Sequence, residues 1–204
     1  MTRHSALLLV DIQYDFLEGG ALAVPESADI LIPVVALAEM FDTIVLTQDW
    51  HPAGHKSFAS SHDGKNPYDT VLWKGCTEVL WPDHCVQNSW GAELHPSVLN
   101  LHPAVIIQKG IHPETDSYSA FFDNHREHKT KLEDWLNQHD IRHLVVAGLA
   151  TDYCVLHTVK DALELGLTVD VFTPGCRAVN LLPEDGKKAL DEMKSAGAGI
   201  RHWI

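Results

Sequence analysis

Cys154 is the first residue whose type and setting point to chemistry. It lies in the string GLATDYCV, between the apolar segment HLVVA and a stretch whose apolar residues follow helical spacing. We expect Thr151 or Asp152 to cap that helix, so that Cys154 falls in its first turn. There the helix dipole favours a thiolate, and free backbone N–H groups can hold the oxyanion of an acyl transfer. The alternative is a cysteine that only packs as a small apolar residue. The other cysteines lack this setting and are assigned structural roles: Cys76, Cys85 and Cys176.

Two charged residues directly follow other apolar segments. Asp11 comes after ALLLV, and Lys109 comes after AVIIQ. If both segments are parallel strands, their carboxyl ends lie at the edge where open α/β sheets place their sites. A fixed ammonium there would hold a carboxylate and a thiol in their charged or hydrogen-bonded forms. We therefore predict that Asp11, Lys109 and Cys154 meet at one edge; the alternative is that Asp11 caps a turn and Lys109 is a solvated strand end.

A metal site is indicated by Asp49 and His51, which are two positions apart at the end of an apolar segment. Residues with that spacing in a strand point to the same side and can share one ion. A third ligand from WPDHC, His84, would complete a set of two histidines and one carboxylate, which is typical of a catalytic ion with open positions. The spacing alone is weak, and His55 and His62 are nearer in sequence and compete with His84 for this place.

The elements that must position these residues alternate along the chain. Near-continuous apolar runs predict parallel strands covered on both faces, and helical spacing between them predicts right-handed crossovers and a three-layer α/β/α fold. The predicted strands are 6–10, 43–47, 104–108, 143–147, 168–172 and 200–203, and the predicted helices are 27–40, 129–138, 153–165 and 183–196.

Two long segments interrupt this alternation. Residues 49–99 are rich in His, Pro, Gly, Ser and Trp, and 110–127 is a second irregular stretch. Connections of this length are usually functional loops. We expect one domain over residues 1–204, with a metal-binding loop insertion at about 49–99.

Composition limits the partners. The 204 residues are 45% apolar and carry a formal net charge of -13, which disfavours nucleic acid and membrane surfaces and is compatible with a small neutral substrate. The start MTRHSALLLVDIQ does not read as a signal peptide, and four cysteines without close pairing suit a reducing compartment, so we expect a cytoplasmic protein. The sequence leaves a homo-oligomer open.

Taken together, these strings resemble the nicotinamidase/pyrazinamidase branch of the isochorismatase-like cysteine hydrolases. The resemblance rests on DIQYDFLEGGALAVP, TQDWHP, WPDHCVQNSWGAELHP, KGIHPETDSYSAF and GLATDYCV, which occur in family order over most of the chain. It implies a six-stranded parallel sheet flanked by helices, in agreement with the elements counted above. It also implies hydrolysis of nicotinamide, and of pyrazinamide, to the acid and ammonia through a cysteine thioester, a reaction of NAD salvage.

The resemblance assigns residues to roles. Asp11, Lys109 and Cys154 would form the catalytic triad, and Asp49, His51 and His84 would bind one divalent metal, with zinc as first choice and iron or manganese as alternatives. The backbone N–H groups of Ala150 and Cys154 would hold the oxyanion, and the Leu149–Ala150 peptide matches a position that is cis in the family. The pocket walls would be Phe16, Leu22, Trp81 and Tyr153. Some members use an additional histidine after D-x-H, which leaves His55 open as a further ligand.

The same resemblance implies a route in which the metal takes the ring nitrogen of nicotinamide and so orients the carboxamide over Cys154. Three other functions compete with this one. Within the superfamily they are an isochorismatase, which typically lacks the cysteine and the metal set, and an amidohydrolase acting on a carbamoyl or ureido group. Outside it, a non-catalytic metal-binding protein would leave the grouping of Asp11, Lys109 and Cys154 unexplained.

Overall fold

Six parallel strands form the central sheet of the computed structural model, which describes residues 4–202. The order is β5-β2-β1-β6-β7-β8, and every pairing in it is parallel. The strands are β1 Ser5–Val10, β2 Ile44–Asp49, β5 Val105–Lys109, β6 His143–Leu149, β7 Thr168–Arg177 and β8 Gly199–Arg201. The predicted sheet is confirmed, although part of the last predicted strand, at 203, lies outside the described residues.

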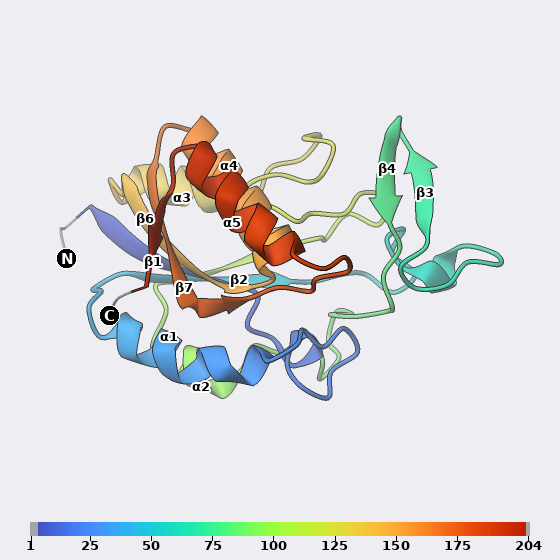
Figure 1. The fold of residues 1–204 in the computed structure, drawn as a ribbon, viewed down its shortest axis with the longest axis horizontal. Helices are drawn as coiled ribbons and strands as arrows, with labels where there is room; N and C mark the ends of the chain where they lie inside the picture. Colours follow the sequence, from blue (N-terminus) through green and yellow to red (C-terminus); the bar gives the residue numbers. More distant parts are fainter. Residues whose placement is uncertain (1–3, 203–204) are drawn as a thin grey trace.

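Helices cover both faces of this sheet. Figure 1 shows α1 and α2 below it and α3, α4 and α5 above it. The helices are α1 Leu31–Ala38, α2 Pro96–Leu99, α3 Leu132–Gln138, α4 Leu156–Glu164 and α5 Asp185–Ser195. Short 3-10 helices span Tyr14–Phe16, Ser27–Ile30 and Ala59–Ser61, and a π-helical turn spans Thr151–Val155. All four predicted helical stretches contain a helix, with 27–40 divided into a 3-10 turn and α1.

The innermost strands explain the apolar runs. Every residue of β1 is buried, and six of the seven residues of β6 are buried, because helices cover both of their faces. The edge strand β5 instead alternates between more and less exposed positions. Continuous hydrophobicity therefore marks the centre of the sheet.

The strand order also determines where a ligand can bind. From β1 the chain turns to β2 on one side, and it returns after β5 to place β6 on the other side of β1. In open parallel sheets such a reversal opens a crevice at the carboxyl ends of the two strands. Asp11 follows β1 and the turn containing Cys154 follows β6, so both flank this crevice.

A two-stranded hairpin that the sequence did not predict lies within residues 49–99. Its strands, β3 Thr70–Trp73 and β4 Cys76–Val79, project away from the main sheet (Figure 1). Lys74 and Gly75 have φ of 47° and 85°, as a two-residue type I′ turn requires. Lys-Gly is a weaker hairpin signal than Asn-Gly, and each strand has only four residues, so the sequence pattern does not predict this hairpin.

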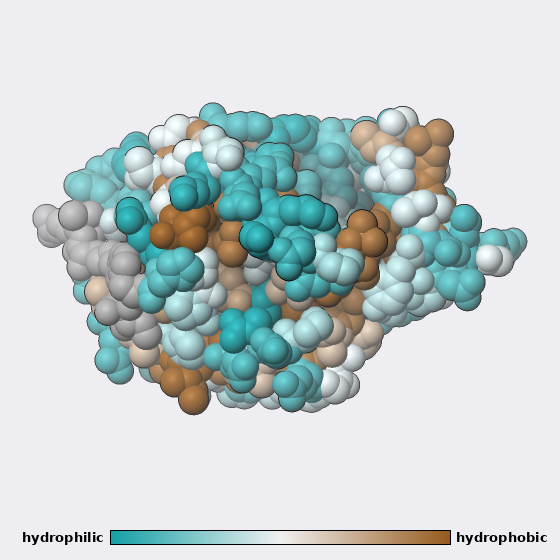
Figure 2. All heavy atoms as spheres, in the orientation of Figure 1, coloured by the Kyte–Doolittle hydropathy of each residue, from teal (hydrophilic) through white to brown (hydrophobic). Residues whose placement is uncertain are grey.

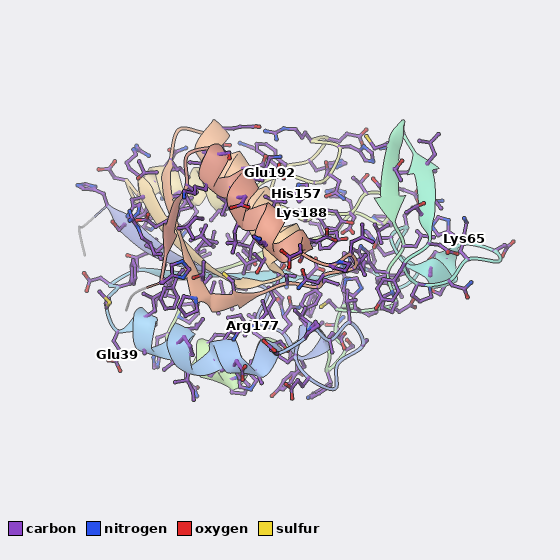
Figure 3. All side chains as sticks on the ribbon, in the orientation of Figure 1. Glu39, Lys65, His157, Arg177, Lys188 and Glu192 are labelled. Atoms are coloured by element: carbon purple, nitrogen blue, oxygen red, sulfur yellow. The ribbon has the colours of Figure 1, made fainter. Side chains whose placement is uncertain are left out.

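The outer surface is largely hydrophilic on the face shown in Figure 2, with separate apolar spots. Polar side chains such as His157, Lys188 and Glu192 stand on α4 and α5 in Figure 3, and Lys160 pairs with Glu192 across these two helices. Within residues 4–202, no helix combines the length and the apolar character needed to cross a bilayer.

Gly148 packs directly against the backbone of the neighbouring strand, and it supplies a stability test. It has φ of 129°, and a Cβ there would lie 2.1 Å from the carbonyl oxygen of Val10 on β1. We expect Gly148→Ala to lower the free energy of unfolding by more than about 3 kcal/mol, measured by urea titration. Gly166→Ala is the control, since Gly166 also has positive φ (83°) but nothing within 4 Å of the added Cβ, and it should cost only about 1–2 kcal/mol. Equal losses in the two variants would contradict the close packing of β1 on β6.

Candidate active site

The structure brings Asp11, Lys109 and Cys154 together at the carboxyl edge of the sheet. The Lys109 Nζ lies 2.9 Å from Asp11 Oδ2 and 3.5 Å from Cys154 Sγ. All three side chains are buried, and Asp11 and Lys109 are almost completely inaccessible. A thiol, a carboxylate and an ammonium in contact at a crevice can carry out nucleophilic catalysis with proton transfer.

The Lys109 ammonium has all of its contacts inside the protein. Besides Asp11 and Cys154, its ammonium contacts Asp49 Oδ1 at 3.0 Å and donates to the carbonyl oxygen of Ser117 at 2.8 Å. Burial works to lower the pKa of Lys109, but the two carboxylates outweigh it and raise the pKa well above its usual value. Lys109 therefore stays charged and links Asp11 to Asp49.

Asp11 is held on its other side by Thr47. The Thr47 hydroxyl donates to Asp11 Oδ1 at 2.5 Å, and the Asp11 backbone N–H donates to the same hydroxyl oxygen at 3.0 Å. Burial raises the pKa of Asp11, Lys109 opposes that rise, and the charge of Asp49 adds to it. A carboxylate with a raised pKa is a stronger base than an ordinary aspartate.

The burial of Cys154 acts against the thiolate expected from its place at a helix terminus. Burial raises the pKa of Cys154 well above its usual value; the charge of Lys109 lowers it, but those of Asp11 and Asp49 raise it further. Desolvation of the sulfur outweighs the attraction of one ammonium. A nucleophilic role for Cys154 would therefore require a base, and Asp11, which contacts the same Lys109 ammonium, is the carboxylate placed to act as one.

The predicted N-cap is also wrong. Ala150 occupies the cap position, and no side chain caps this turn. The Asp152 carboxylate instead accepts the N–H groups of Val179 (2.9 Å) and Asn180 (2.8 Å). The turn closes through the N–H groups of Tyr153 and Val155, which both donate to the carbonyl of Ala150. The Leu149–Ala150 peptide before it is cis, as expected.

Three predicted metal ligands form one cluster beside Lys109. The ligand atoms of Asp49, His51 and His84 all lie within 4.8 Å of one another, with Asp49 Oδ2 2.8 Å from His51 Nε2 and 3.4 Å from His84 Nε2. The Nδ1 atoms of the two histidines face the backbone carbonyls of Gly110 (3.0 Å) and Pro82 (2.8 Å). Imidazoles fixed in this way by carbonyl groups, with both Nε2 atoms beside a carboxylate, suit a divalent metal.

The structure does not bring the competing histidines into this cluster. The His55 ring lies beside that of His51, with centroids 4.3 Å apart and an interplanar angle of 41°, but its Nδ1 contacts Ser57 Oγ and its Nε2 contacts the carbonyl of His112, each at 2.8 Å. His62 Nε2 contacts the carbonyl of Lys56. Both ring nitrogens of His55 are thus engaged with the protein.

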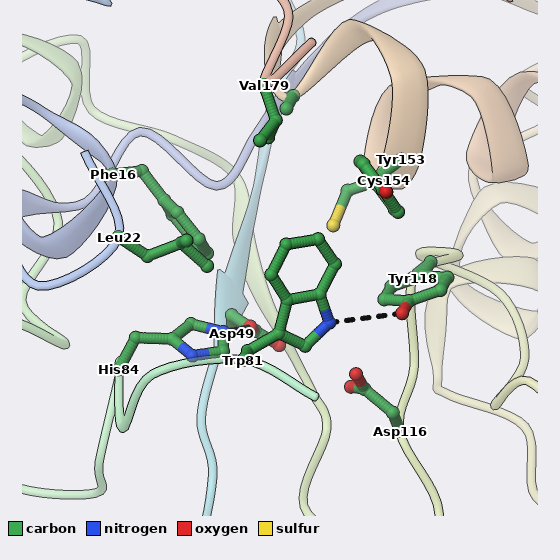
Figure 4. A pocket seen from close by; sticks show the side chains of 11 residues that line it. Phe16, Leu22, Asp49, Trp81, His84, Asp116, Tyr118, Tyr153, Cys154 and Val179 are labelled. Carbon is green, nitrogen blue, oxygen red and sulfur yellow. Dashed lines mark hydrogen bonds and ion pairs between the residues drawn. The ribbon is translucent and has the colours of Figure 1, made fainter. Parts of the chain in front are cut away.

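A small cavity lies between the metal-ligand cluster and the thiol (Figure 4). Its empty space is about 370 Å³, part of it open to solvent, and Asp49, His84 and Cys154 all line it. The four residues predicted as walls line it as well: Phe16, Leu22, Trp81 and Tyr153. Its size and aromatic walls suit a single planar ring.

Several residues of the site were missed from the sequence. Tyr118 accepts a hydrogen bond from Trp81 Nε1 at 3.1 Å, and Asp116 and Val179 line the same cavity. Gln13, which is fully buried, donates to the carbonyl of Asp49 and accepts the N–H of Asp49, both at 2.8 Å. The strings DIQYDF and KGIHPETDSYSAF contained three of these residues, but nothing in the spacing told which side chains turn inward.

Comparison with known proteins agrees with this geometry. The sequence pattern of the isochorismatase domain matches residues 5–203. The chain belongs to the isochorismatase family. Within that family it is 52% identical over 199 residues to the nicotinamidase of Escherichia coli (strain K12), covering 96% of this chain and 93% of that protein.

Solved structures of nicotinamidases and pyrazinamidases have the same fold as this chain. The Acinetobacter baumanii nicotinamidase/pyrazinamidase has a TM-score of 0.94 at 38% identity, with 98% of this chain and 96% of that one covered. The Pyrococcus horikoshii pyrazinamidase in complex with zinc has a TM-score of 0.78 at 36% identity, with 98% and 99% covered. The predicted six-stranded isochorismatase-like fold is thereby confirmed.

Removal of the buried ammonium tests the electrostatics of this family site. In Lys109→Met the carboxylate of Asp11 remains buried without its cation, whereas Asp49 keeps His51 beside it, and the free energy of unfolding at pH 7 should fall by about 3–5 kcal/mol. Because burial already raises the pKa of Asp11 and Lys109 opposes that rise, the pKa of Asp11 in the folded variant lies still further above the unfolded value, so the stability it contributes is present at low pH and is lost as the pH increases. We therefore expect the difference in free energy of unfolding between Lys109→Met and wild type to become smaller as the pH falls from 7 to 5, measured by urea titration with a chelator present. Lys129→Met, which removes an exposed lysine paired with Asp134, is the control and should unfold with the same free energy as wild type. A loss of stability in Lys109→Met that does not change with pH would contradict the role of the buried ion pair.

Proposed function

We propose that this protein hydrolyses the carboxamide of nicotinamide to nicotinate and ammonia through a thioester on Cys154. The observation that carries the proposal is one aromatic cavity with the thiol and the Asp11–Lys109 pair at one side and the metal-ligand cluster at the other. The names of the relatives support the substrate, and we infer that pyrazinamide, which keeps a ring nitrogen beside the same carboxamide, is also hydrolysed. Return of nicotinate to NAD synthesis would place the reaction in NAD salvage.

Asp11 and Cys154 perform the chemical steps. Asp11 takes the thiol proton as Sγ attacks the carbonyl carbon, and the C=O electrons move onto the oxygen. When the tetrahedral adduct collapses, the C–N bond breaks, and the proton on Asp11 passes to the departing nitrogen to release ammonia. Asp11 then takes a proton from water as the water oxygen attacks the thioester carbonyl. When this adduct collapses, the C–S bond breaks, the proton on Asp11 passes to the sulfur to restore the thiol, and the acid leaves as nicotinate after losing its own proton to solvent. Lys109 holds Asp11 and the sulfur next to each other, since its Nζ lies 2.9 Å from Asp11 Oδ2 and 3.5 Å from Cys154 Sγ.

The oxyanion formed in both additions needs donors on the side opposite the base. We propose the backbone N–H groups of Ala150 and Cys154 for this role. In support, the hydrogen bonds that close the turn use two other backbone N–H groups, those of Tyr153 and Val155, and not those of Ala150 and Cys154. Two backbone donors fixed before reaction stabilise the developing charge without reorganisation.

Asp49, His51 and His84 would hold one divalent metal. Asp49 is the last residue of β2, and the two histidines come from the segment that follows it. The zinc complex of the Pyrococcus horikoshii protein favours zinc over iron or manganese. When bound, the ion supplies a Lewis acid with open positions that can take a ring nitrogen and orient the ring. Phe16, Leu22, Trp81 and Tyr153 would hold the faces and edges of that ring.

The competing functions fit the cavity less well. No lysine or arginine is among the described residues that line it, whereas isochorismate and other acidic substrates carry carboxylates that need a cation. Lys109 is not free to serve, because its ammonium already has two buried carboxylate partners. A neutral aromatic amide is therefore the better match.

Substitution of the proposed nucleophile and base tests the chemistry. Cys154→Ala should lower ammonia release from nicotinamide by at least about 1,000-fold with the fold intact, because it removes the attacking atom. Asp11→Asn should lower kcat by at least about 100-fold. Cys176→Ala, a change at another buried cysteine, should keep its activity per folded molecule. Near-normal turnover by Cys154→Ala would refute covalent catalysis at this residue.

Benzamide tests the orienting role of the ring nitrogen, since it has the same carboxamide on a ring without nitrogen. We expect kcat/KM for benzamide to be at least about 100-fold below that for nicotinamide, because the ring is no longer held in place. His84→Ala should lose bound metal, measured by elemental analysis, and nicotinamide hydrolysis with it, whereas His62→Ala should keep both. Comparable turnover of the two amides, or full metal content in His84→Ala, would show that the ion has another place or role.

A further inference from the structure

We infer that Asp15 is a positioning residue that fixes the metal ligands relative to the apolar wall of the pocket. This inference rests on the proposed function, because it concerns the proposed metal ligands and substrate walls. Asp15 itself lines neither the metal-ligand cluster nor the cavity. It acts through two backbone N–H groups on separate segments of the chain.

One oxygen of Asp15 holds the metal-ligand segment. Asp15 Oδ2 accepts the backbone N–H of Cys85 at 2.7 Å. Cys85 directly follows His84, and its carbonyl oxygen accepts the backbone N–H of His51 at 2.9 Å. Asp15 therefore acts on both histidines of the cluster through Cys85: His84 is joined to Cys85 by the peptide bond, and His51 is joined to it by a hydrogen bond.

The other oxygen holds the pocket wall. Asp15 Oδ1 accepts the backbone N–H of Ala21 at 3.1 Å, and the carbonyl of Asp15 accepts the N–H of Leu22 at 2.9 Å. Phe16, the next residue in the chain, contacts His84 with ring centroids 5.5 Å apart. One carboxylate thus ties the wall formed by Phe16 and Leu22 to the segment that carries His84.

Gly91 holds this carboxylate in place. Its carbonyl accepts the backbone N–H of Asp15 at 2.9 Å, and a Cβ at position 91 would lie 2.1 Å from Asp15 Oδ2. A methyl group there would displace the carboxylate without changing its charge. Gly91→Ala is therefore an independent way to disturb the same contact.

Three variants and zinc test the role: Asp15→Asn, Gly91→Ala and the control Asp83→Asn. In Asp15→Asn the amide NH₂ faces an N–H donor, so one of the two bonds is lost. We expect its zinc dissociation constant, measured against a competing chelator, to increase about tenfold or more. KM for nicotinamide at saturating zinc should increase more than kcat falls, and Gly91→Ala should show the same pattern. Asp83→Asn removes the same charge directly beside His84, but Asp83 is exposed and bonds Ser60, so this variant should match wild type.

The triad provides an internal control for the fold. Asp15 does not contact Asp11, Lys109 or Cys154, so the alkylation rate of Cys154 in the zinc-free variants, followed by peptide mass mapping, should equal that of wild type. Wild-type zinc affinity and KM in Asp15→Asn would overturn the inference. So would equal losses in Asp83→Asn, or a loss of zinc and kcat accompanied by a changed rate of Cys154 alkylation, both in proportion to the unfolded fraction. If wild-type protein binds no zinc, the proposed metal site itself fails and this inference with it; if wild type binds zinc and Asp15→Asn equals it, only this inference fails.

Discussion

The ammonium of Lys109, buried between two carboxylates, is the interaction on which the site depends. The strand order β5-β2-β1-β6 sets Lys109, Asp49, Asp11 and the turn of Cys154 in a row along one edge of the sheet. Asp49 and Lys109 are direct partners in the β2–β5 register, and Lys109 reaches past β2 to Asp11 and Cys154. Because one cation neutralises both the proposed base and a proposed metal ligand, the covalent chemistry and the metal site share one electrostatic centre.

This arrangement separates the tasks of the scaffold and the insertions. The sheet holds the reacting groups rigidly, since β1 and β6 are buried on both faces. The irregular segments 49–99 and 110–127 supply the histidines and much of the cavity wall, and they meet where Trp81 donates to Tyr118. In the proposed function, substrate recognition would therefore depend on contacts between loops, such as those made by Asp15, more than on the sheet itself.

The sequence was most informative where physical constraints are local. Continuous apolar runs predict the central strands. Asp11 and Lys109 directly follow two of these runs, and because the end of a strand fixes the place of the next side chain, their meeting at one edge of the sheet could be predicted. The lowered pKa expected for Cys154 is opposed by its burial, which raises the pKa. The position of a helix terminus can be recognised in the sequence, but the depth of burial cannot. The hairpin at 70–79 and the contacts of Gln13 depend on long-range packing that no local spacing reports.

A covalent thioester at Cys154 is the central step of the proposed mechanism, and mass spectrometry of acid-quenched enzyme mixed with nicotinamide tests it most directly. Under conditions where acylation outpaces hydrolysis, we expect a mass increase of one nicotinoyl group on the peptide that contains Cys154, and no such adduct in Asp11→Asn. An adduct on the peptide of Cys76, Cys85 or Cys176 would contradict the assignment of the nucleophile. Full turnover with no adduct on any cysteine would contradict the thioester itself.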